Sequence, residues 1–518
     1  FIFNYKSVKK KNQILNKYFF IFLIILLFEF FTLDFENYNH LSDIFHEGLW
    51  LSASQNSNFN NEFWLSSYVG RGFFGNFHPY LIWKIFDIES VGAVRFFHLF
   101  IILLNKILLL MISKKITELV DIDDNKKILF FSFLSIIFLS FTSYGEPVFI
   151  IRSLLLLLFI FFLLTFFSNY GSKKSILVLG LISSASFFWY IDVGAYINLT
   201  SLILAFFFLI RLEIKNLIFF IFSILVGWGL IILIIPREEF KAFLDNTLLI
   251  FSTIEYIQGL IFPTPFSGDF RSTRALLIFL ITGTAIIYLL KDLNKKNLLF
   301  LISNFFLFLI GLIYFKYGLS RSDSVHIRVA QSFIYLPFFS ILLYLIFSIL
   351  KNKIKIKNYI NISIIILFLF SSFIDKKYEN KSVKNIIHSY SSINKLINYD
   401  DKIFLNQDYN DFISYYKKIT SLDKCITLFT HEVALTYFLK KPSCSKFYLM
   451  YTATPEIIQN QLIQDIALKK PSFIVYNSNV DLYGSNSDNL KLVNKFIISK
   501  YRFFEKFKHW EIYKINDF

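Results

Sequence analysis

The segment 42–48 reads SDIFHEG and brings two carboxylates and an imidazole close together. Asp43 and Glu47 are four residues apart, so a helix over this segment would place them on one face. Paired carboxylates can supply a general base or hold a metal ion. The alternative is an amphipathic turn whose charged side chains only face water. The chemical interpretation predicts that Asp43 or Glu47 is a catalytic base and that His46 helps to bind a substrate.

A second group of charged residues lies in other loops between apolar segments. Arginine can hold a phosphate group through two parallel hydrogen bonds. An acid in a very short loop at a membrane edge is costly unless it is hydrated or paired. The alternative is that these loops carry only local ion pairs in water. The residues predicted to bind a substrate or its phosphate group are Arg152, Asp192, Arg321, Asp323, His326 and Arg328.

The apolar segments that must position these residues are long. The chain has 518 residues, is 55% hydrophobic and 20% aromatic, and has a mean hydropathy of +0.54. These values are typical of a polytopic membrane protein. The fold class expected is therefore membrane all-α, with about eleven transmembrane helices. They are predicted near 18–31, 96–112, 128–141, 153–167, 176–189, 195–210, 217–235, 275–290, 298–314, 329–350 and 360–373, the first of them uncleaved.

Lysine is concentrated in alternate loops, which the positive-inside rule assigns to the cytoplasm. The loops with Asp, Glu, His and Arg then share the other side, where they could form one polar site. The N-terminus is predicted to be cytoplasmic and the C-terminus to be outside. Much of the formal charge of +16 belongs to the cytoplasmic loops, so we expect no nucleic-acid partner. These loops contain Lys114, Lys115, Lys126, Lys127, Lys173, Lys174, Arg211, Lys215, Lys291, Lys295, Lys296, Lys351, Lys353, Lys355 and Lys357.

Long hydrophilic segments interrupt this pattern on the outer side. The segments 34–95 and 236–274 contain apolar stretches too short to span a bilayer, and helices lying on the membrane surface fit them. The C-terminal segment 375–518 is long enough for a small soluble domain. Its pattern predicts an α/β domain. The elements expected are strands at 426–429, 473–476 and 510–513, and helices at 432–439 and 456–467.

The chain has two cysteines, Cys425 and Cys444, and both lie in this C-terminal segment. On the outer side of a membrane a disulfide bond persists, so the two are predicted to pair. The alternative is a pair of free buried thiols, since the distance between them cannot be read from the sequence.

The first long loop has acids at 43 and 47, then GLWL at 48–51, FW at 63–64 and PYLIW at 79–83. This order of motifs resembles the first loop of the GT-C superfamily, the multi-pass glycosyltransferases that use polyprenyl-phosphate-linked sugars. The family pattern is an acid, then Gly-Asp-Trp-Leu, an aromatic stretch and Pro-Leu-x-x-Trp. Leu49 stands where the family often has an acid, so Asp43 and Glu47 both remain candidates for the base.

The resemblance implies a multi-pass enzyme of a bacterial inner membrane. It would have a transmembrane domain at 1–374 and a periplasmic α/β domain at 375–518. It would move a sugar from a polyprenyl-phosphate donor to an acceptor glycan, lipid or protein at the periplasmic face, in contact with membrane lipid. A divalent metal ion is compatible with such a site but is not required, because arginine side chains can stabilise the same charge.

Other classes of function remain open at this stage. A transporter or flippase for lipid-linked saccharides would place polar residues through the centres of its spans, and this chain has few beyond Asn105 and Lys106. A ligase or polymerase of lipid-linked saccharides would use similar outer arginines. A degenerate family member could serve as a scaffold without catalysis.

Overall fold

The computed structural model describes most of the chain, and every structural statement below concerns this part alone. The predicted span at 360–373 and most of the one at 18–31 lie outside it, as do residues 144–146. The described residues are 21–27, 41–141, 147–258, 263–267, 270–291, 297–320, 324–349, 396–476 and 490–516.

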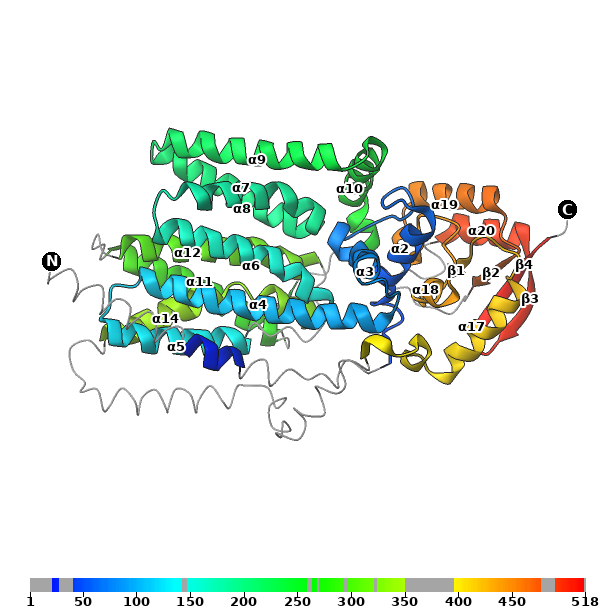
Figure 1. Cartoon of the computed structure of the whole chain (residues 1–518), viewed down its shortest axis with the longest axis horizontal. Coiled ribbons are helices and arrows are strands. Elements are labelled where there is room, and N and C mark those ends of the chain that lie inside the picture. Colours follow the sequence, from blue (N-terminus) through cyan, green and yellow to red (C-terminus); the bar gives the residue numbers. More distant parts are fainter. Residues whose placement is uncertain are drawn as a thin grey trace.

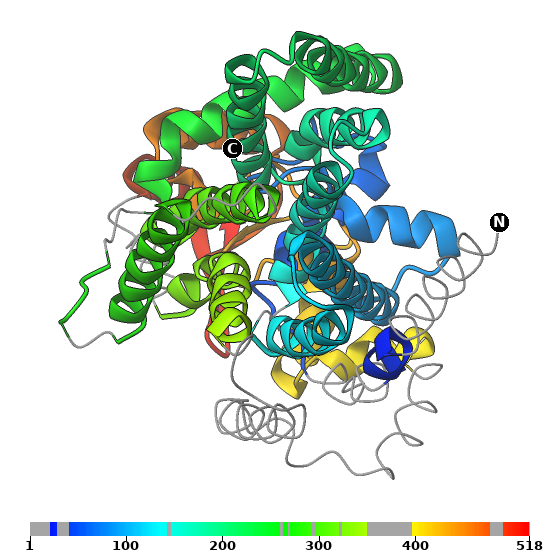
Figure 2. The ribbon, with the colours of Figure 1, turned by 90° about the vertical axis from the view of Figure 1, so that its left-hand side faces the viewer.

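Long apolar helices form a bundle at one end of the molecule, and Figure 2 shows this bundle end-on. A helix needs about 20 apolar residues to cross a bilayer. Six of the described helices, α4, α6, α8, α9, α11 and α12, are long and apolar enough to do so, as expected for a multi-pass membrane protein; about eleven were predicted. The bundle comprises α4 (Val91–Leu119), α5 (Asp124–Phe141), α6 (Pro147–Ser168), α7 (Lys173–Trp189), α8 (Ile191–Ile210), α9 (Ile214–Ile234), α11 (Phe270–Lys291), α12 (Leu298–Ser320) and α14 (Tyr335–Ile349) (Figure 1).

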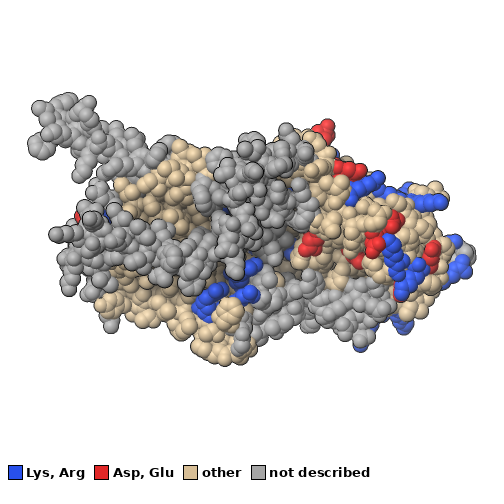
Figure 3. Space-filling model, turned by 90° about the horizontal axis from the view of Figure 1, so that it is seen from below, with Lys and Arg blue, Asp and Glu red and all other residues tan. Residues whose placement is uncertain are grey.

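The outer surface of the bundle is apolar. Helix α9 leaves Leu225, Leu233 and Ile234 exposed to 63%, 83% and 77%. Exposing such side chains to water costs about 25 cal/mol per Å² of apolar area, whereas lipid tails remove that cost. In Figure 3, acidic and basic side chains gather over the C-terminal part, while the described surface of the bundle is mostly uncharged. The distribution fits helices surrounded by lipid.

The predicted span at 329–350 contains α14, which begins six residues later than predicted. The structure divides this segment into α13 (Ser324–Ala330) and α14, joined by a turn. Gln331 lies in this turn, and its amide donates a hydrogen bond to the carbonyl oxygen of Arg271 (2.8 Å). Pro337 lies in the first turn of α14, where proline is tolerated because its missing N–H would have no helical partner there.

Three further helices come from the two long hydrophilic segments 34–95 and 236–274. They are α2 (Gly48–Asn60), α3 (Phe73–Phe86) and α10 (Arg237–Gln258). They lie between the bundle and the C-terminal part (Figure 1). Glu239 of α10 binds the loop after α2, because its two carboxylate oxygens accept hydrogen bonds from the backbone N–H groups of Phe63 (2.7 Å) and Trp64 (2.9 Å). The loop is thereby fixed to α10.

The C-terminal part contains a four-stranded sheet in the order β1-β2-β4-β3. Strands β1 and β2 are parallel, and the other neighbours are antiparallel. The strands predicted at 426–429, 473–476 and 510–513 are confirmed within a few residues, whereas β3 was not predicted. The elements are β1 (Thr427–Phe429), β2 (Phe473–Tyr476), β3 (Tyr501–Phe507), β4 (Trp510–Ile515), α17 (Gln407–Ile419), α18 (Leu435–Leu439), α19 (Glu456–Lys469), α20 (Lys491–Lys500) and the 3-10 turns η4 (Asp401–Phe404) and η5 (Met450–Ala453).

Helices cover both faces of this sheet. Ile474 of β2 belongs to a core with Leu462 of α19 and Ile497 of α20. Its neighbour Val475 belongs instead to the larger core that includes Phe412 of α17. Successive residues of a strand point to opposite faces, so the two cores lie on opposite sides of the sheet. Cys425 and Cys444 form a disulfide bond beside β1.

Candidate active site

The turn at 44–47 leads directly into α2, which begins at Gly48. At Gly48 the chain passes against the C-terminal part, and a Cβ atom there would lie 2.3 Å from the backbone nitrogen of Ala434. The same nitrogen donates a hydrogen bond to the carbonyl oxygen of Ile44 (3.0 Å). Only glycine allows this approach, and the turn is therefore held in a fixed position.

Glu47 is buried and paired. It is 5% exposed, and Arg95 of α4 is 2% exposed. The Nε and NH2 groups of Arg95 each donate a 3.0 Å hydrogen bond to one carboxylate oxygen of Glu47. The guanidinium also lies 4.6 Å from the ring centre of Phe404. A carboxylate held in this way is a structural anchor, and it has no open side for a substrate.

Asp43 is exposed instead. Its Oδ1 accepts hydrogen bonds from the backbone N–H groups of Phe45 (3.2 Å) and His46 (2.9 Å), and its Oδ2 lies 2.6 Å from Nδ1 of His46. Partial burial acts to raise the pKa of Asp43, but the hydrogen bonds from His46 and the backbone outweigh it and lower the pKa below its usual value. Asp43 is therefore an ionised partner for the imidazole.

The expectation that Asp43 and Glu47 share one helix face is wrong, because the segment between them is a turn and not a helix. One carboxylate points into the protein and the other toward solvent. Since Asp43 is ionised, Nδ1 of His46 carries the proton in their hydrogen bond. In the neutral imidazole Nε2 is then the acceptor, and it makes no hydrogen bond to the described residues.

Arg152 and Asp192, predicted from different loops, form an ion pair. Arg152 is 8% exposed, and its guanidinium lies 3.9 Å from the ring centre of Tyr317 and 5.7 Å from that of Tyr190. Within the described residues, its Nε is buried without a hydrogen-bond partner. Asp192 lies in the first turn of α8, at the end of the bundle that faces α2 and α3.

Arg71 belongs to the same group, although sequence reasoning missed it. Its carbonyl oxygen accepts a hydrogen bond from the backbone N–H of Ile191 (3.2 Å), one residue before Asp192. The next residue, Gly72, has φ +96, and a Cβ atom there would lie 2.9 Å from Cα of Tyr190. NH1 of Arg71 is buried and has no hydrogen-bond partner in the described part of the chain. The only signal in the sequence was the pair of glycines that flank this arginine.

The remaining predicted residues are divided. The ring of His326 in α13 lies 5.2 Å from that of Tyr317, so His326 joins the group around Arg152. Arg328 is exposed on the same short helix. Arg321 and Asp323 lie outside the described residues.

Aromatic residues connect the exposed pair with the arginine group. Phe45, between Asp43 and His46, lies 5.8 Å from the ring of Tyr451. The phenol oxygen of Tyr448, three residues before Tyr451, accepts a hydrogen bond from the side chain of Asn76 (3.1 Å). The backbone N–H of Asn76 donates in turn to the carbonyl oxygen of Gly72, the residue after Arg71 (3.2 Å). Over the residues that the structure describes, no group of three or more His, Cys, Asp or Glu side chains could hold a metal ion. The described part of the candidate site thus contains one exposed imidazole–carboxylate pair and two arginines.

No protein-family model and no curated protein matches this chain. Among solved structures, it is similar to the crystal structure of an oligosaccharyltransferase from Archaeoglobus fulgidus, tethered through a disulfide bond to an acceptor peptide with the NVT sequon. The identity is 11%, the TM-score is 0.48, and the alignment covers 96% of this chain and 74% of that chain.

Proposed function

We propose that this chain is a GT-C-type glycosyltransferase of a bacterial inner membrane. It moves a sugar from a polyprenyl-phosphate donor to an acceptor hydroxyl at the periplasmic face. The proposal is carried by one observation: the exposed Asp43–His46 pair directly precedes α2, and Arg71, in the loop between α2 and α3, meets the start of α8 beside the Arg152–Asp192 pair. The sequence resemblance of the first loop to the GT-C superfamily supports it independently.

In the proposed reaction, Nε2 of His46 takes the proton of the acceptor group. The acceptor atom then forms a bond to the anomeric carbon of the sugar, and the bond from that carbon to the phosphate oxygen breaks with its electron pair. Asp43 holds the imidazole in the required tautomer and stabilises the imidazolium, as a carboxylate does in other Asp–His pairs. Three hydrogen bonds already engage the carboxylate of Asp43, so the imidazole is the better base.

The leaving group is polyprenyl phosphate, whose negative charge grows as the sugar departs. Arg71 has an unengaged buried N–H group, while the charge of Arg152 is balanced by Asp192. We assign the phosphate to Arg71 first and to Arg152 second. Fixed donors of this kind stabilise developing charge because they need no reorganisation during the reaction.

The orientation of the chain follows from the lysine-rich loops. The N-terminus lies in the cytoplasm, and residues 375–518 form a periplasmic domain after about eleven spans. Substituted-cysteine labelling from outside the cell should reach a cysteine introduced at Ser322. It should not reach one introduced at Lys295. Labelling at Lys295 from outside would overturn this orientation, and with it a periplasmic reaction.

The assignment of the base is tested by sugar transfer in membranes that contain the chain and its lipid-linked donors. His46→Ala should reduce transfer by on the order of 10²–10⁴-fold, and added imidazole should restore part of it. Asp43→Asn should also reduce transfer, without imidazole rescue. If His46→Ala keeps most of the activity while Asp43→Asn loses it, the carboxylate itself is the base. Full transfer by both variants would remove Asp43 and His46 from the reaction and overturn this mechanism.

The assignment of the phosphate is tested in the same membranes. Arg71→Gln should raise the KM for the lipid-linked donor, because it removes a charged donor from the leaving group. Arg237→Gln is the matched control, since this arginine is exposed at the start of α10. Equal effects of the two substitutions would remove Arg71 from the site.

A further inference from the structure

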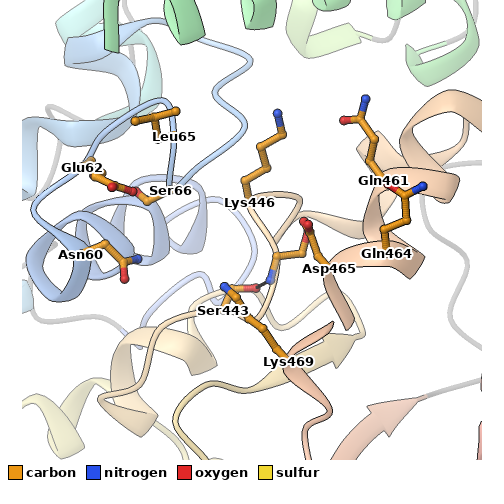
Figure 4. Close-up of a pocket in the computed structure, with 11 residues that line it drawn as sticks. Asn60, Glu62, Leu65, Ser66, Ser443, Lys446, Gln461, Gln464, Asp465 and Lys469 are labelled. Carbon is orange, nitrogen blue, oxygen red and sulfur yellow. Dashed lines mark hydrogen bonds between the residues drawn. The ribbon is translucent and has the colours of Figure 1, made fainter. Parts of the chain in front are cut away.

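A polar pocket of about 490 Å³ lies between the loop after α2 and helix α19, and Figure 4 shows its lining. One wall comes from the end of α2 and the following loop, the opposite wall from α19, and the floor from the segment 443–446. The only apolar side chain in the lining is that of Leu65. The lining residues are Asn60, Glu62, Leu65, Ser66, Ser443, Ser445, Lys446, Gln461, Gln464, Asp465 and Lys469.

The floor of this pocket is held in place from several sides. The disulfide bond joins Cys444 to Cys425 beside β1, and the backbone N–H of Cys444 donates to the carbonyl oxygen of Ile426 (2.9 Å). The backbone N–H of Ser443 donates to the side chain of Asn56 in α2 (2.8 Å). The hydroxyl of Ser445 donates to Asp465 of α19 (2.6 Å). Both walls are therefore tied to one rigid floor.

The polar groups of the walls, in contrast, are largely unengaged. The side chains of Asn60, Gln461 and Gln464 make no hydrogen bonds to the described residues, and neither does the carboxylate of Glu62. Each carboxamide offers donors and acceptors together. Two carboxylates and two ammonium groups line the pocket, so their formal charges cancel. Such a lining favours a neutral ligand that carries many hydroxyl groups.

The pocket is separate from the candidate active site. Asn60 is the last residue of α2, whereas the Asp43–His46 turn precedes its first residue. A helix of 13 residues is about 20 Å long at 1.5 Å per residue. A ligand that occupied both places would have to be an extended chain.

We propose that this pocket binds a neutral saccharide segment of the acceptor, remote from its reacting end. The identification of that saccharide as the acceptor rests on the proposed glycosyl transfer, whereas its binding does not. A peptide would be expected to use apolar side-chain pockets or an open strand edge, and the pocket has neither. The preformed floor lowers the entropy lost on binding.

Binding is measured with the purified full chain carrying Asp43→Asn, so that no transfer consumes the probe. The probe is an array of microbial glycans, followed by titration calorimetry with the best-retained neutral oligosaccharide. The double substitution Gln461→Ala/Gln464→Ala should weaken binding about tenfold, since each lost hydrogen bond contributes roughly 0.5–1.5 kcal/mol. Gln407→Ala is the control, because Gln407 is exposed on α17 and its amide donates to Asp411.

Retention of neutral glycans that depends on Gln461 and Gln464 supports the pocket even if transfer is never detected. Retention of no glycan, or equal binding by the double variant, overturns it while leaving the active-site proposal untouched. Retention of charged glycans alone also overturns it, because the charges of the lining cancel. If Asp43→Asn abolishes transfer but the double variant transfers normally to long and short acceptors alike, the bound saccharide is not the acceptor.

Discussion

The first long loop has a buried side and an exposed side, and the two use similar residues differently. On the buried side, Glu47 pairs with Arg95, and Nε2 of His78 lies 2.9 Å from Nε2 of His98. On the exposed side, Asp43 pairs with His46. Carboxylates and imidazoles occur on both sides. Only the exposed pair has a side open to a substrate.

The difference shows that burial decides what a charged pair does. Removing water strengthens the attraction within a pair, but it makes each partner depend on the other. The Glu47–Arg95 pair therefore holds the loop in one conformation. Either partner alone would be a buried charge without compensation. An exposed pair contributes little to stability, which leaves Asp43 and His46 free to be selected for chemistry.

The largest effect expected from this comparison is on stability. Glu47→Gln removes the charge that compensates Arg95 and should destabilise the protein by roughly 3–5 kcal/mol. Asp43→Asn should change stability by about 1 kcal/mol or less, because surface pairs contribute little. Thermal unfolding in detergent, followed by fluorescence, compares the two variants with the parent chain.

A double substitution sharpens this test. Glu47→Gln/Arg95→Gln replaces the ion pair by two neutral amides that can still form a hydrogen bond, and it should recover part of the lost stability. If Glu47→Gln is as stable as the parent chain yet inactive, Glu47 has a direct role in the reaction and the comparison drawn here fails.

The sequence could predict the membrane class, most helices of the bundle and the central strands of the C-terminal sheet. These features depend on the spacing of apolar residues over whole segments, so a few atypical residues do not change the prediction. It also predicted that Arg152 and Asp192 belong to one polar site, from the contrast between the lysine-rich loops and the loops that carry Asp, Glu, His and Arg. Strand β3 escaped prediction because it is an edge strand whose middle residues are exposed.

The roles of Asp43 and Glu47 could not be predicted, because Arg95 is 48 residues away from Glu47 in the chain. A four-residue spacing indicates a shared helix face only where a helix exists, and contacts of Gly48 with Ala434 decide that the segment 44–47 is a turn. Arg71 was missed for the same reason. Its position depends on a contact with Ile191 that is distant in sequence.

The second buried pair predicts a smaller effect that depends on pH. Nδ1 of His78 lies 2.7 Å from the carbonyl oxygen of Phe74, so Nδ1 carries the proton and donates the hydrogen bond. Nε2 of His78 then accepts a hydrogen bond from Nε2–H of His98. Burial lowers the pKa of His78 from 6.5 to about 3. Between pH 6.5 and about pH 3, the unfolded chain therefore binds a proton at His78 and the folded chain does not. The stability contributed by neutral His78 is complete above pH 6.5 and is lost as the pH falls toward 3.

At pH 4.5 this loss should reach about 3 kcal/mol relative to neutral pH, at roughly 1.4 kcal/mol for each pH unit below the unfolded pKa. His78→Gln should be less stable at pH 7 but should lose less between pH 7 and pH 4.5, measured as the shift of the unfolding midpoint. Asp43→Asn is the control from the exposed side. Its carboxyl has a lowered pKa, so it affects stability only near and below pH 4. If the unfolding midpoints of His78→Gln and the parent chain shift equally between pH 7 and pH 4.5, His78 is not the cause of the acid destabilisation. Burial would then not determine the protonation of this histidine.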